Sequence, residues 1–348
     1  MGPGDSLASV GERAQGAGVS FGCSSPMPVN YPRITLRHPI APILKPRLPL
    51  SPGTIVCALL FPFHSTWRAF ALVACVLLLQ GCSAVKLAYN QAPQLVYWRL
   101  NNYFNLTDAQ ADRLRSELGD LHQWHRDQML PQHAALLQQV QQRLADDITA
   151  DQACRVYADV RLQIDQLIAQ VEPRLVVLAS QLTESQIRNF EKQQADSNAD
   201  WRREWLDVPA DKLAAHRFKL LLSRAEGFYG ALQESQKAAL RSFIAQSTFD
   251  PQRSYAERLR RQKDLAQVLR QIATDPGSTE RNRSLLRGYM ERFNTSPDPA
   301  YQGYARKLVE EGCAGFALVH RAMTPAQRMK AVQSVKGYEQ DFWVLAGR

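Results

Sequence analysis

The sequence lacks several motifs by which common catalytic sites are recognised. It contains no GxxxxGK phosphate loop, no HExxH pair and no GxGxxG dinucleotide turn. These absences argue against P-loop nucleotidases, HExxH metalloproteases and dinucleotide-dependent dehydrogenases. Acids and histidines are present, but no spacing among them demands catalysis. The sequence therefore predicts a protein that is not an enzyme, with no cofactor and no small-molecule substrate.

Cysteine is scarce, and its spacing argues against the usual metal and redox sites. The chain has six cysteines in 348 residues, and no two of them have CxxC spacing, which removes zinc-ribbon and thioredoxin-like sites. Only Cys154 and Cys313 follow Cys82. In an oxidising compartment two spare thiols can form a disulfide. The alternative is two small buried apolar side chains, and the sequence leaves the choice open because it does not fix the distance between them.

Hydrophobic runs long enough to span a membrane are also lacking. The run AFALVACVLLL at residues 69–79 has eleven residues and follows Arg68, whereas a membrane-spanning helix needs about 20. A short apolar run after a basic residue is typical of a secretory signal, so we expect residues 54–81 to be a signal peptide. Residues 1–53 are rich in Gly, Pro and Ser. We expect them to be disordered or untranslated, with the true start nearer residues 54–60.

The four residues that end this segment resemble the lipobox of bacterial lipoproteins. In Leu79-Gln80-Gly81-Cys82 an aliphatic residue stands three before the cysteine and a small residue just before it. Gln80 departs from the small or aliphatic residue that is usual there. The resemblance implies cleavage between Gly81 and Cys82 and acylation of Cys82 with palmitate-like chains, and several such chains anchor a protein stably. Ser83 favours the outer membrane, so we expect a lipid-anchored protein that faces the periplasm.

The charge balance argues against a nucleic-acid partner. The formal net charge is +9, but the part after Cys82 carries 36 basic and 31 acidic residues. Such a balance keeps a protein soluble and tolerates an anionic surface nearby. We expect the membrane as one partner, reached through the lipid anchor, and an envelope protein as another.

A pentapeptide of the form LTxxQ recurs after Cys82 and predicts where helices begin. Its threonine oxygen can accept a hydrogen bond from the N–H three residues on, while the glutamine reaches back to the threonine N–H. Acidic residues in the first turn suit the helix dipole. The copies begin at residues 106, 148, 182, 232 and 323, with Gln233 replacing threonine in the fourth. Their unequal spacing argues against uniform repeats.

The positions seven residues beyond each cap are predicted to face the core. They are Leu114, Val156, Phe190, Leu240 and Ala331. Prolines between the amphipathic segments mark helix boundaries or kinks. The sequence therefore predicts an all-α fold, an irregular multi-helix bundle of eight to ten helices over residues 90–347. An acylated tether at residues 82–89 and the signal peptide would precede it.

Three segments resemble a widespread family of bacterial lipoproteins of unknown function. They are LAYN at residues 87–90, YFNLT at residues 103–107 and a WHR…LP segment at residues 124–131, with Asn105 replacing the family's usual acid. The resemblance extends to MTPAQ and GYEQDF near the C-terminus. It implies a periplasm-facing helical lipoprotein and no particular activity. The LTxxQ pentapeptide is also similar to that of Spy/CpxP-type periplasmic chaperones.

Three groups of side chains are candidates for chemistry or binding. His122 and His125 lie three residues apart on one predicted helix. They are weak candidates for a metal site, because only two ligands have suitable spacing, and hydrogen-bonded histidines are the favoured interpretation. Trp201 and Trp205 are interpreted as core residues rather than an exposed patch. The basic run at residues 258–263 is interpreted as a solvated helix face rather than a site for anionic lipid headgroups.

These observations favour a non-enzymatic envelope lipoprotein that binds a protein partner or maintains the envelope. Two alternatives stay open. One is a periplasmic holdase-type chaperone or stress sensor, which the LTxxQ copies suggest. The other is a metal-dependent enzyme built around His122 and His125.

Overall fold

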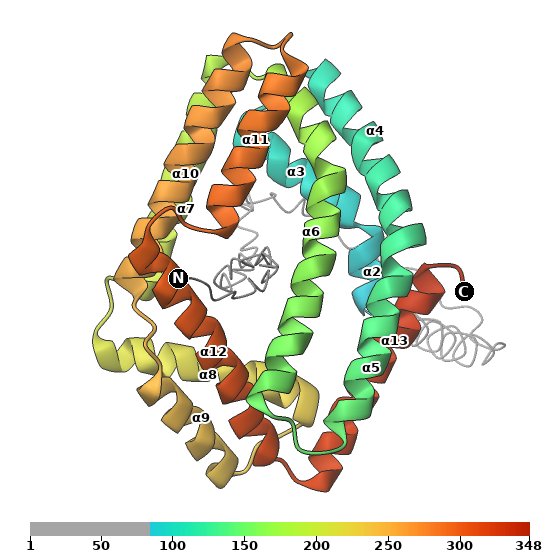
Figure 1. The fold of residues 1–348 in the computed structure, drawn as a ribbon, viewed down its shortest axis with the longest axis vertical. Coiled ribbons are helices and arrows are strands. Elements are labelled where there is room, and N and C mark those ends of the chain that lie inside the picture. Colours follow the sequence, from blue (N-terminus) through green and yellow to red (C-terminus); the bar gives the residue numbers. More distant parts are fainter. Residues whose placement is uncertain (1–83) are drawn as a thin grey trace, which may run out of the picture.

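The described chain is built from helices. The computed structural model describes residues 84–348, and this part contains no strand. Its twelve α-helices and one π-helical segment are drawn in Figure 1 and are α2 (Ala84–Asn90), α3 (Ala92–Phe104), α4 (Asp108–Trp124), η1 (His125–Met129), α5 (Leu130–Leu144), α6 (Ala150–Ser180), α7 (Glu184–Trp205), α8 (Ala210–Tyr229), α9 (Glu234–Gln246), α10 (Pro251–Thr274), α11 (Thr279–Asn294), α12 (Pro299–Arg321) and α13 (Pro325–Leu345). Because α4, η1 and α5 follow one another without a break, they form one rod. The all-α prediction is confirmed, and this part alone has more helices than the eight to ten predicted.

The LTxxQ copies begin helices as predicted. In four copies the threonine and the glutamine exchange both hydrogen bonds of a capping box, at the N-caps Thr107, Thr149, Thr183 and Thr324. In the fourth copy the backbone N–H of Gln233 donates to Gln236 Oε1 at 2.8 Å. The positions seven residues beyond the caps are buried in four helices. The exception is Val156, which is only partly buried and lines a cavity between helices.

The glutamines of two pairs of copies also bind each other across the bundle. Gln186 Nε2 donates to Gln110 Oε1 at 2.6 Å and to the Asn105 carbonyl at 3.2 Å. Gln236 Nε2 donates in the same way to Gln327 Oε1 at 2.6 Å. We call these two pairs the glutamine clasps; Gln110, Gln186 and Gln236 are buried and Gln327 is partly buried. The first joins the starts of α4 and α7, and the second joins the starts of α9 and α13 at the opposite end of the molecule (Figure 1).

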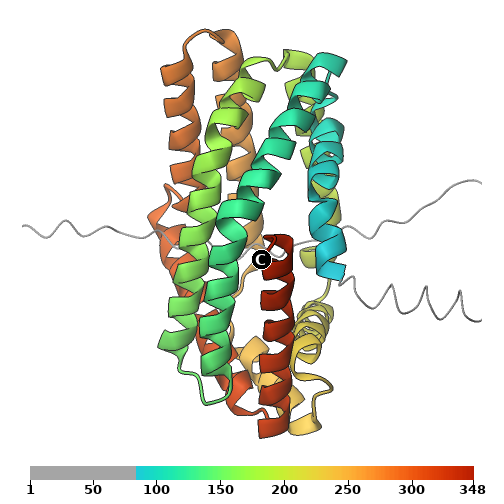
Figure 2. The same ribbon diagram turned by 90° about the vertical axis from the view of Figure 1, so that its right-hand side faces the viewer.

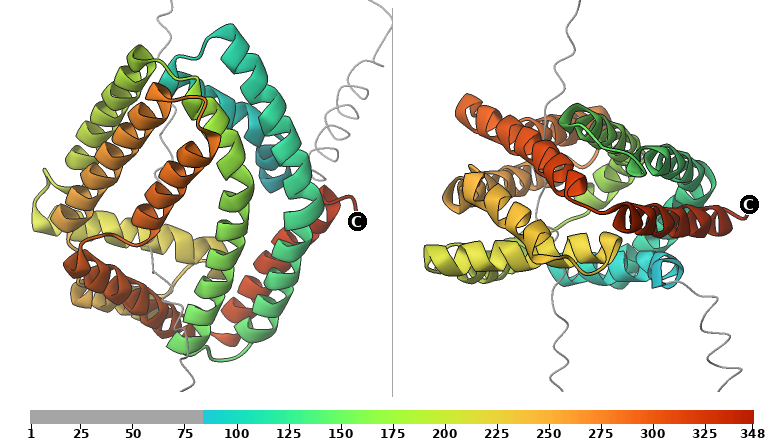
Figure 3. Two further views of the ribbon diagram at one scale, coloured as in Figure 1. Left: turned by 45° about the horizontal axis from the view of Figure 1, so that its top comes forward. Right: turned by 90° about the horizontal axis from the view of Figure 1, so that it is seen from below.

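Two long rods run the length of the molecule between the two largest of the four apolar cores in residues 84–348. The 31-residue helix α6 lies beside the α4–η1–α5 rod, and the molecule is thinner when turned by 90° (Figure 2). The larger core, around Ile187 and Ile272, brings together α3, α6, α7, α10 and α11. The other core, around Leu240 and Ala331, joins α8, α9, α12 and α13. Figure 3 shows α8, α9 and α12 gathered at that end.

Pro131 accounts for the π-helical segment in the rod. Proline has no N–H, and its ring clashes with the carbonyl four residues earlier, which belongs here to Asp127. The rod widens over His125–Met129, just before the proline, so that the N–H of Leu130 reaches the carbonyl of His125. Such π-bulges inside α-helices are frequent at functional sites.

Residues 84–89, which were expected to belong to the acylated tether, form helix α2. This helix packs against α3 and α13, and Lys86 Nζ lies 3.5 Å from a carboxylate oxygen of Asp341. Because α2 finds partners on both sides, the folded body includes residues 84–89 and does not start at residue 90.

The predicted leader lies outside the described residues. This applies to residues 1–53, to the signal peptide at residues 54–81, and to Gly81 and Cys82 at the lipobox. Among the helices of residues 84–348, none has the length and apolar character needed to cross a bilayer.

Candidate functional site

The LAYN and WHR segments lie against each other at the π-helical segment. Tyr89 Oη lies 3.0 Å from His125 Nδ1, and the Tyr89 carbonyl lies 3.1 Å from His122 Nε2. Beside them, Arg126 donates to Asn90 Oδ1 at 2.8 Å. Two motifs that are separate in sequence thus make one contact, which fixes α2 to the long rod.

His133 extends this contact into a cluster of three histidines. Its Nε2 lies 3.4 Å from His125 Nε2, and its Nδ1 lies 2.6 Å from Gln163 Oε1 on α6. Burial, together with the neighbouring His133 and His122, lowers the pKa of His125 to about 4. Burial also lowers the pKa values of His122 and His133, so the three rings are neutral at pH 7. Among residues 84–348, no group of three or more His, Cys, Asp or Glu is placed to hold a metal ion.

Trp201 and Trp205 belong to the core, as their helical spacing predicts. They are 4% and 5% exposed. The ring of Trp201 stacks on Tyr255 with centroids 5.3 Å apart, and Trp205 meets the ring of His216 edge-on at 4.9 Å. The pair therefore offers no aromatic patch to a partner.

The basic run at residues 258–263 differs from the solvated face that was expected. Arg261 is buried and donates to Glu257 Oε1 at 2.8 Å, and Arg260 donates to the same carboxylate at 2.8 Å. Arg258 donates to Asn198 Oδ1 at 2.6 Å. The physical reason is the spacing: Glu257 lies three and four residues before two of the arginines, so one acid on the same helix face binds both.

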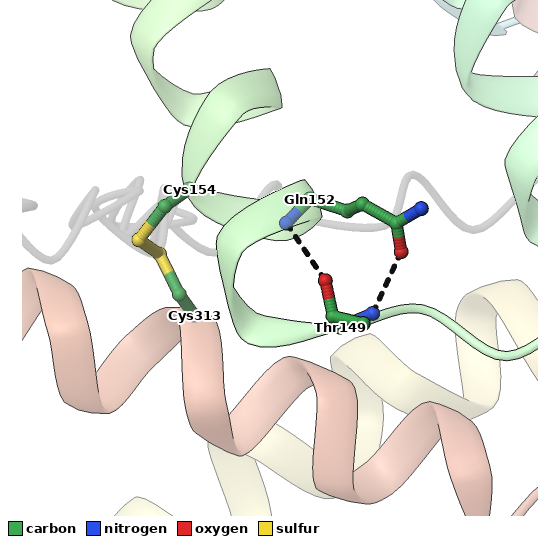
Figure 4. Close-up of a disulfide and its surroundings, with 4 residues drawn as sticks. All are labelled: Thr149, Gln152, Cys154 and Cys313. Atoms are coloured by element: carbon green, nitrogen blue, oxygen red, sulfur yellow. Dashed lines mark hydrogen bonds between the residues drawn. A yellow bond between two sulfur atoms is a disulfide. The ribbon is translucent and has the colours of Figure 1, made fainter.

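A disulfide joins Cys154 on α6 to Cys313 on α12 (Figure 4). Their Cα atoms are 5.4 Å apart and their sequence separation is 159 residues. Cys154 follows two residues after Gln152, whose capping box begins α6. The bond therefore ties the second turn of one long helix to the middle of another.

An apolar cavity of about 540 Å³ lies between α5, α6, α8, α9, α12 and α13. Its walls include Leu137, Phe243 and Val335. A second apolar cavity of about 320 Å³ adjoins it. The residues that line both are Val140, Leu144, Val156, Gly312 and Phe316. Apolar spaces of this size are typical of ligand sites in proteins.

The larger cavity is open to solvent and has very few charged walls. Phe228 and Phe316 line it although they are 40% and 42% exposed. Among residues 84–348, Arg224 is the only charged side chain that lines it, and Arg143 is the only one that lines the smaller cavity. Neither guanidinium has a hydrogen bond or an ion pair with another described residue. Gly312 adds no side chain, and a Cβ built there would meet no atom within 4 Å.

Sequence reasoning missed the cavity. Val156 has the helical spacing of a core residue, and Phe228, Phe316 and Arg224 belong to no motif. Nothing in the sequence sets Gln152 of the second LTxxQ copy apart from the glutamines of the other copies, although in the structure it lines the smaller cavity instead of joining a glutamine clasp.

The comparisons with known proteins identify a family without assigning an activity. A model of a family of unknown function, DUF6279, matches residues 102–292, from α3 to α11, which is more than half of the chain. No similar protein was found among curated sequences, and no similar fold among solved structures. The matched residues include four of the LTxxQ copies and most of the helical body. The chain therefore belongs to the family of unknown function DUF6279.

Proposed function

We propose that the chain is a non-enzymatic lipoprotein of the bacterial outer membrane that binds an apolar group of a partner. Lipid on Cys82 would anchor it, with the helical body in the periplasm. The observation that carries the binding role is the apolar cavity of about 540 Å³ between six helices. Burial of apolar surface is the dominant favourable term in association. An apolar group that fills this open cavity is therefore removed from water, which lowers the free energy of the complex.

The position of α2 supports the anchoring part of the proposal. The helix begins at Ala84, two residues after Cys82, and Tyr89 holds it to the long rod. An anchor at Cys82 would therefore keep the body close to the membrane surface rather than on a long linker. Leu87 and Trp98, which are 64% and 58% exposed, lie on α2 and α3, the first two described helices after Cys82.

The chemistry of the cavity supports binding rather than catalysis. General acid–base catalysis needs paired titratable groups near a reacting atom. The larger cavity offers one charged side chain, Arg224, which carries a permanent positive charge. The tyrosines Tyr229 and Tyr338 also line it, and burial raises the pKa of Tyr229 to about 12.

The holdase alternative loses its main support. It was based on the LTxxQ copies, and the glutamines of four copies pair with each other inside the bundle as the glutamine clasps. The pentapeptide is thus accounted for by helix capping and helix packing. We therefore propose binding of a defined apolar group rather than capture of unfolded chains.

The anchor is tested by replacing the lipobox cysteine. Cys82→Ala should abolish incorporation of a palmitate label and release the protein from the membrane fraction. Cys75→Ala is the matched control, because Cys75 lies in the apolar run and its replacement should leave labelling unchanged. Labelling of the Cys82→Ala variant at the level of the native sequence would contradict lipid attachment at Cys82.

The binding site is tested by photocrosslinking in cells. With p-benzoylphenylalanine in place of Phe316, which lines both cavities, ultraviolet light should attach a cellular component to the chain. Adding Gly312→Leu should remove this adduct because leucine fills the cavity. Gly303→Leu is the control on the same helix, since a Cβ at Gly303 also meets no atom within 4 Å. Adducts that ignore both substitutions would count against the site.

A further inference from the structure

We infer that the group bound in the cavity is the acyl chain of a lipid with an anionic head, and that Arg224 binds the head. This inference rests on the proposed function, because it names the ligand of the same cavity. The shared chemistry is a long hydrocarbon chain that ends in a carboxylate or a phosphate.

The shape of the space favours a chain rather than a compact group. The cavities of about 540 Å³ and 320 Å³ adjoin each other, and both are lined by Val140, Leu144 and Phe316. Together their lining runs along α5 from Leu136 to Leu144 and along α12 from Leu308 to Val319. A linear acyl chain can follow such a space and remove apolar surface from water along its whole length.

The walls also favour a lipid over an apolar peptide. A peptide brings backbone N–H and C=O groups, and each must find a hydrogen-bond partner when it is buried. The polar side chains that line the larger cavity are Arg224, Tyr229 and Tyr338, and the hydroxyl of Tyr229 already lies 2.9 Å from His320 Nδ1. An acyl chain has no polar group along its length, so it leaves none unpaired.

The charge at the cavity points to an anionic head. Arg224 is exposed, and no described residue pairs with its guanidinium. Arg143, which is partly buried, lines the smaller cavity, and no described residue pairs with its guanidinium either. A guanidinium binds carboxylate and phosphate through two parallel hydrogen bonds. A head at Arg224 would sit at the solvent-open side, with the chain running inward past Phe316.

The experiment uses the full chain in living cells fed a palmitate analogue that carries a diazirine and a terminal alkyne. Peptide mapping after ultraviolet irradiation reads two positions independently. Label at Cys82 forms without light and reports the anchor, whereas light-dependent label on α5, α8 or α12 reports the cavity ligand. Label on these helices alone would support the inference and contradict lipid attachment at Cys82. Label at Cys82 alone would overturn the inference and support lipid attachment.

Two variant pairs make the test specific. Gly312→Leu should lower the light-dependent label about tenfold or more, and Gly303→Leu should not, although both replace a helical glycine with open space at Cβ. Leucine is the better helix former, so melting temperatures of both variants should not fall. An equal loss of label in both variants, or no loss in either, would overturn the inference.

Arg224→Gln tests the head. It should lower the label about tenfold, which is typical for loss of a charge-assisted hydrogen bond, whereas Lys219→Gln, an exposed residue of the same helix outside the cavity, should have no effect. The mass of lipid that stays bound to the membrane-extracted protein then separates a carboxylate head from a phosphate head. Bound lipid with a neutral or cationic head would overturn the inference.

Discussion

Removal of the Cys154–Cys313 disulfide should cost a large part of the stability of this protein. The bond closes a loop with a sequence separation of 159 residues. The loop-closure relation gives about 5 kcal/mol for a loop of this length at 25 °C. For a chain with about 265 folded residues, a loss of this size lowers the melting temperature by about 10 °C.

The measurement compares thermal unfolding of the native chain and of a Cys154→Ala/Cys313→Ala variant by circular dichroism, each with and without a thiol reductant. Alanine is the better replacement because Cys313 is 6% exposed, and a serine hydroxyl there would lack a partner. The reductant should destabilise the native chain to the level of the variant and leave the variant unchanged. A fall of less than about 2 °C, or two free thiols in the denatured native protein, would refute the loop-closure reasoning.

Three further results are expected. Gln186→Ala should lower the free energy of unfolding by about 2–3 kcal/mol in urea titrations, because it leaves the buried Gln110 side chain unpaired and also removes a helix cap. The control Gln152→Ala loses only a cap and should lower the free energy of unfolding by about 1 kcal/mol. Equal losses in the two variants would show that the glutamine clasp does not stabilise the fold. Because burial lowers the pKa of His125 from 6.5 to about 4, the unfolded chain binds the proton more readily, so stability should be full above pH 6.5 and fall as the pH drops toward 4. The full shift corresponds to about 3.4 kcal/mol, of which about 2 kcal/mol should be seen after solvent screening, and a pH–stability curve that His125→Gln does not flatten would contradict this. Gly315→Ala should destabilise the fold by about 1 kcal/mol or more, because its Cβ would clash with the Phe243 ring, whereas a Cβ at Gly312 on the same helix meets no atom and Gly312→Ala should stabilise the fold by about 1 kcal/mol. Thermal melts with the opposite order would exclude the packing of α12 against α9.

Local features of the fold could be predicted from the sequence because their causes are local. A threonine and a glutamine three residues apart satisfy the same backbone groups wherever they occur, so Thr107 and Thr183 mark helix starts without knowledge of the rest. Leu114 and Phe190 then follow at the spacing of a buried face. The burial of Trp201 and Trp205 follows from the same periodicity.

The features that involve distant partners could not be predicted. The second hydrogen bond of Gln186 goes to a residue 76 positions earlier, and nothing in the pentapeptide encodes that distance. Val156 has the pattern of a core residue, but the helices around it stand far enough apart to leave a cavity. The basic run at residues 258–263 differs, because its partner is local. Glu257 lies three and four residues before Arg260 and Arg261 and binds both, so the ion pairs follow from helical spacing alone.

The glutamine clasps also bear on the order in which the chain can assemble. Each clasp joins residues within one half of the folded chain, 76 and 91 positions apart, so each half can close by itself. Cys154 lies inside the first loop and Cys313 inside the second. Their thiols meet only when both halves have docked. The disulfide-bonded fraction of the chain would therefore report how many molecules have completed folding, and chains with free thiols would be those that have not.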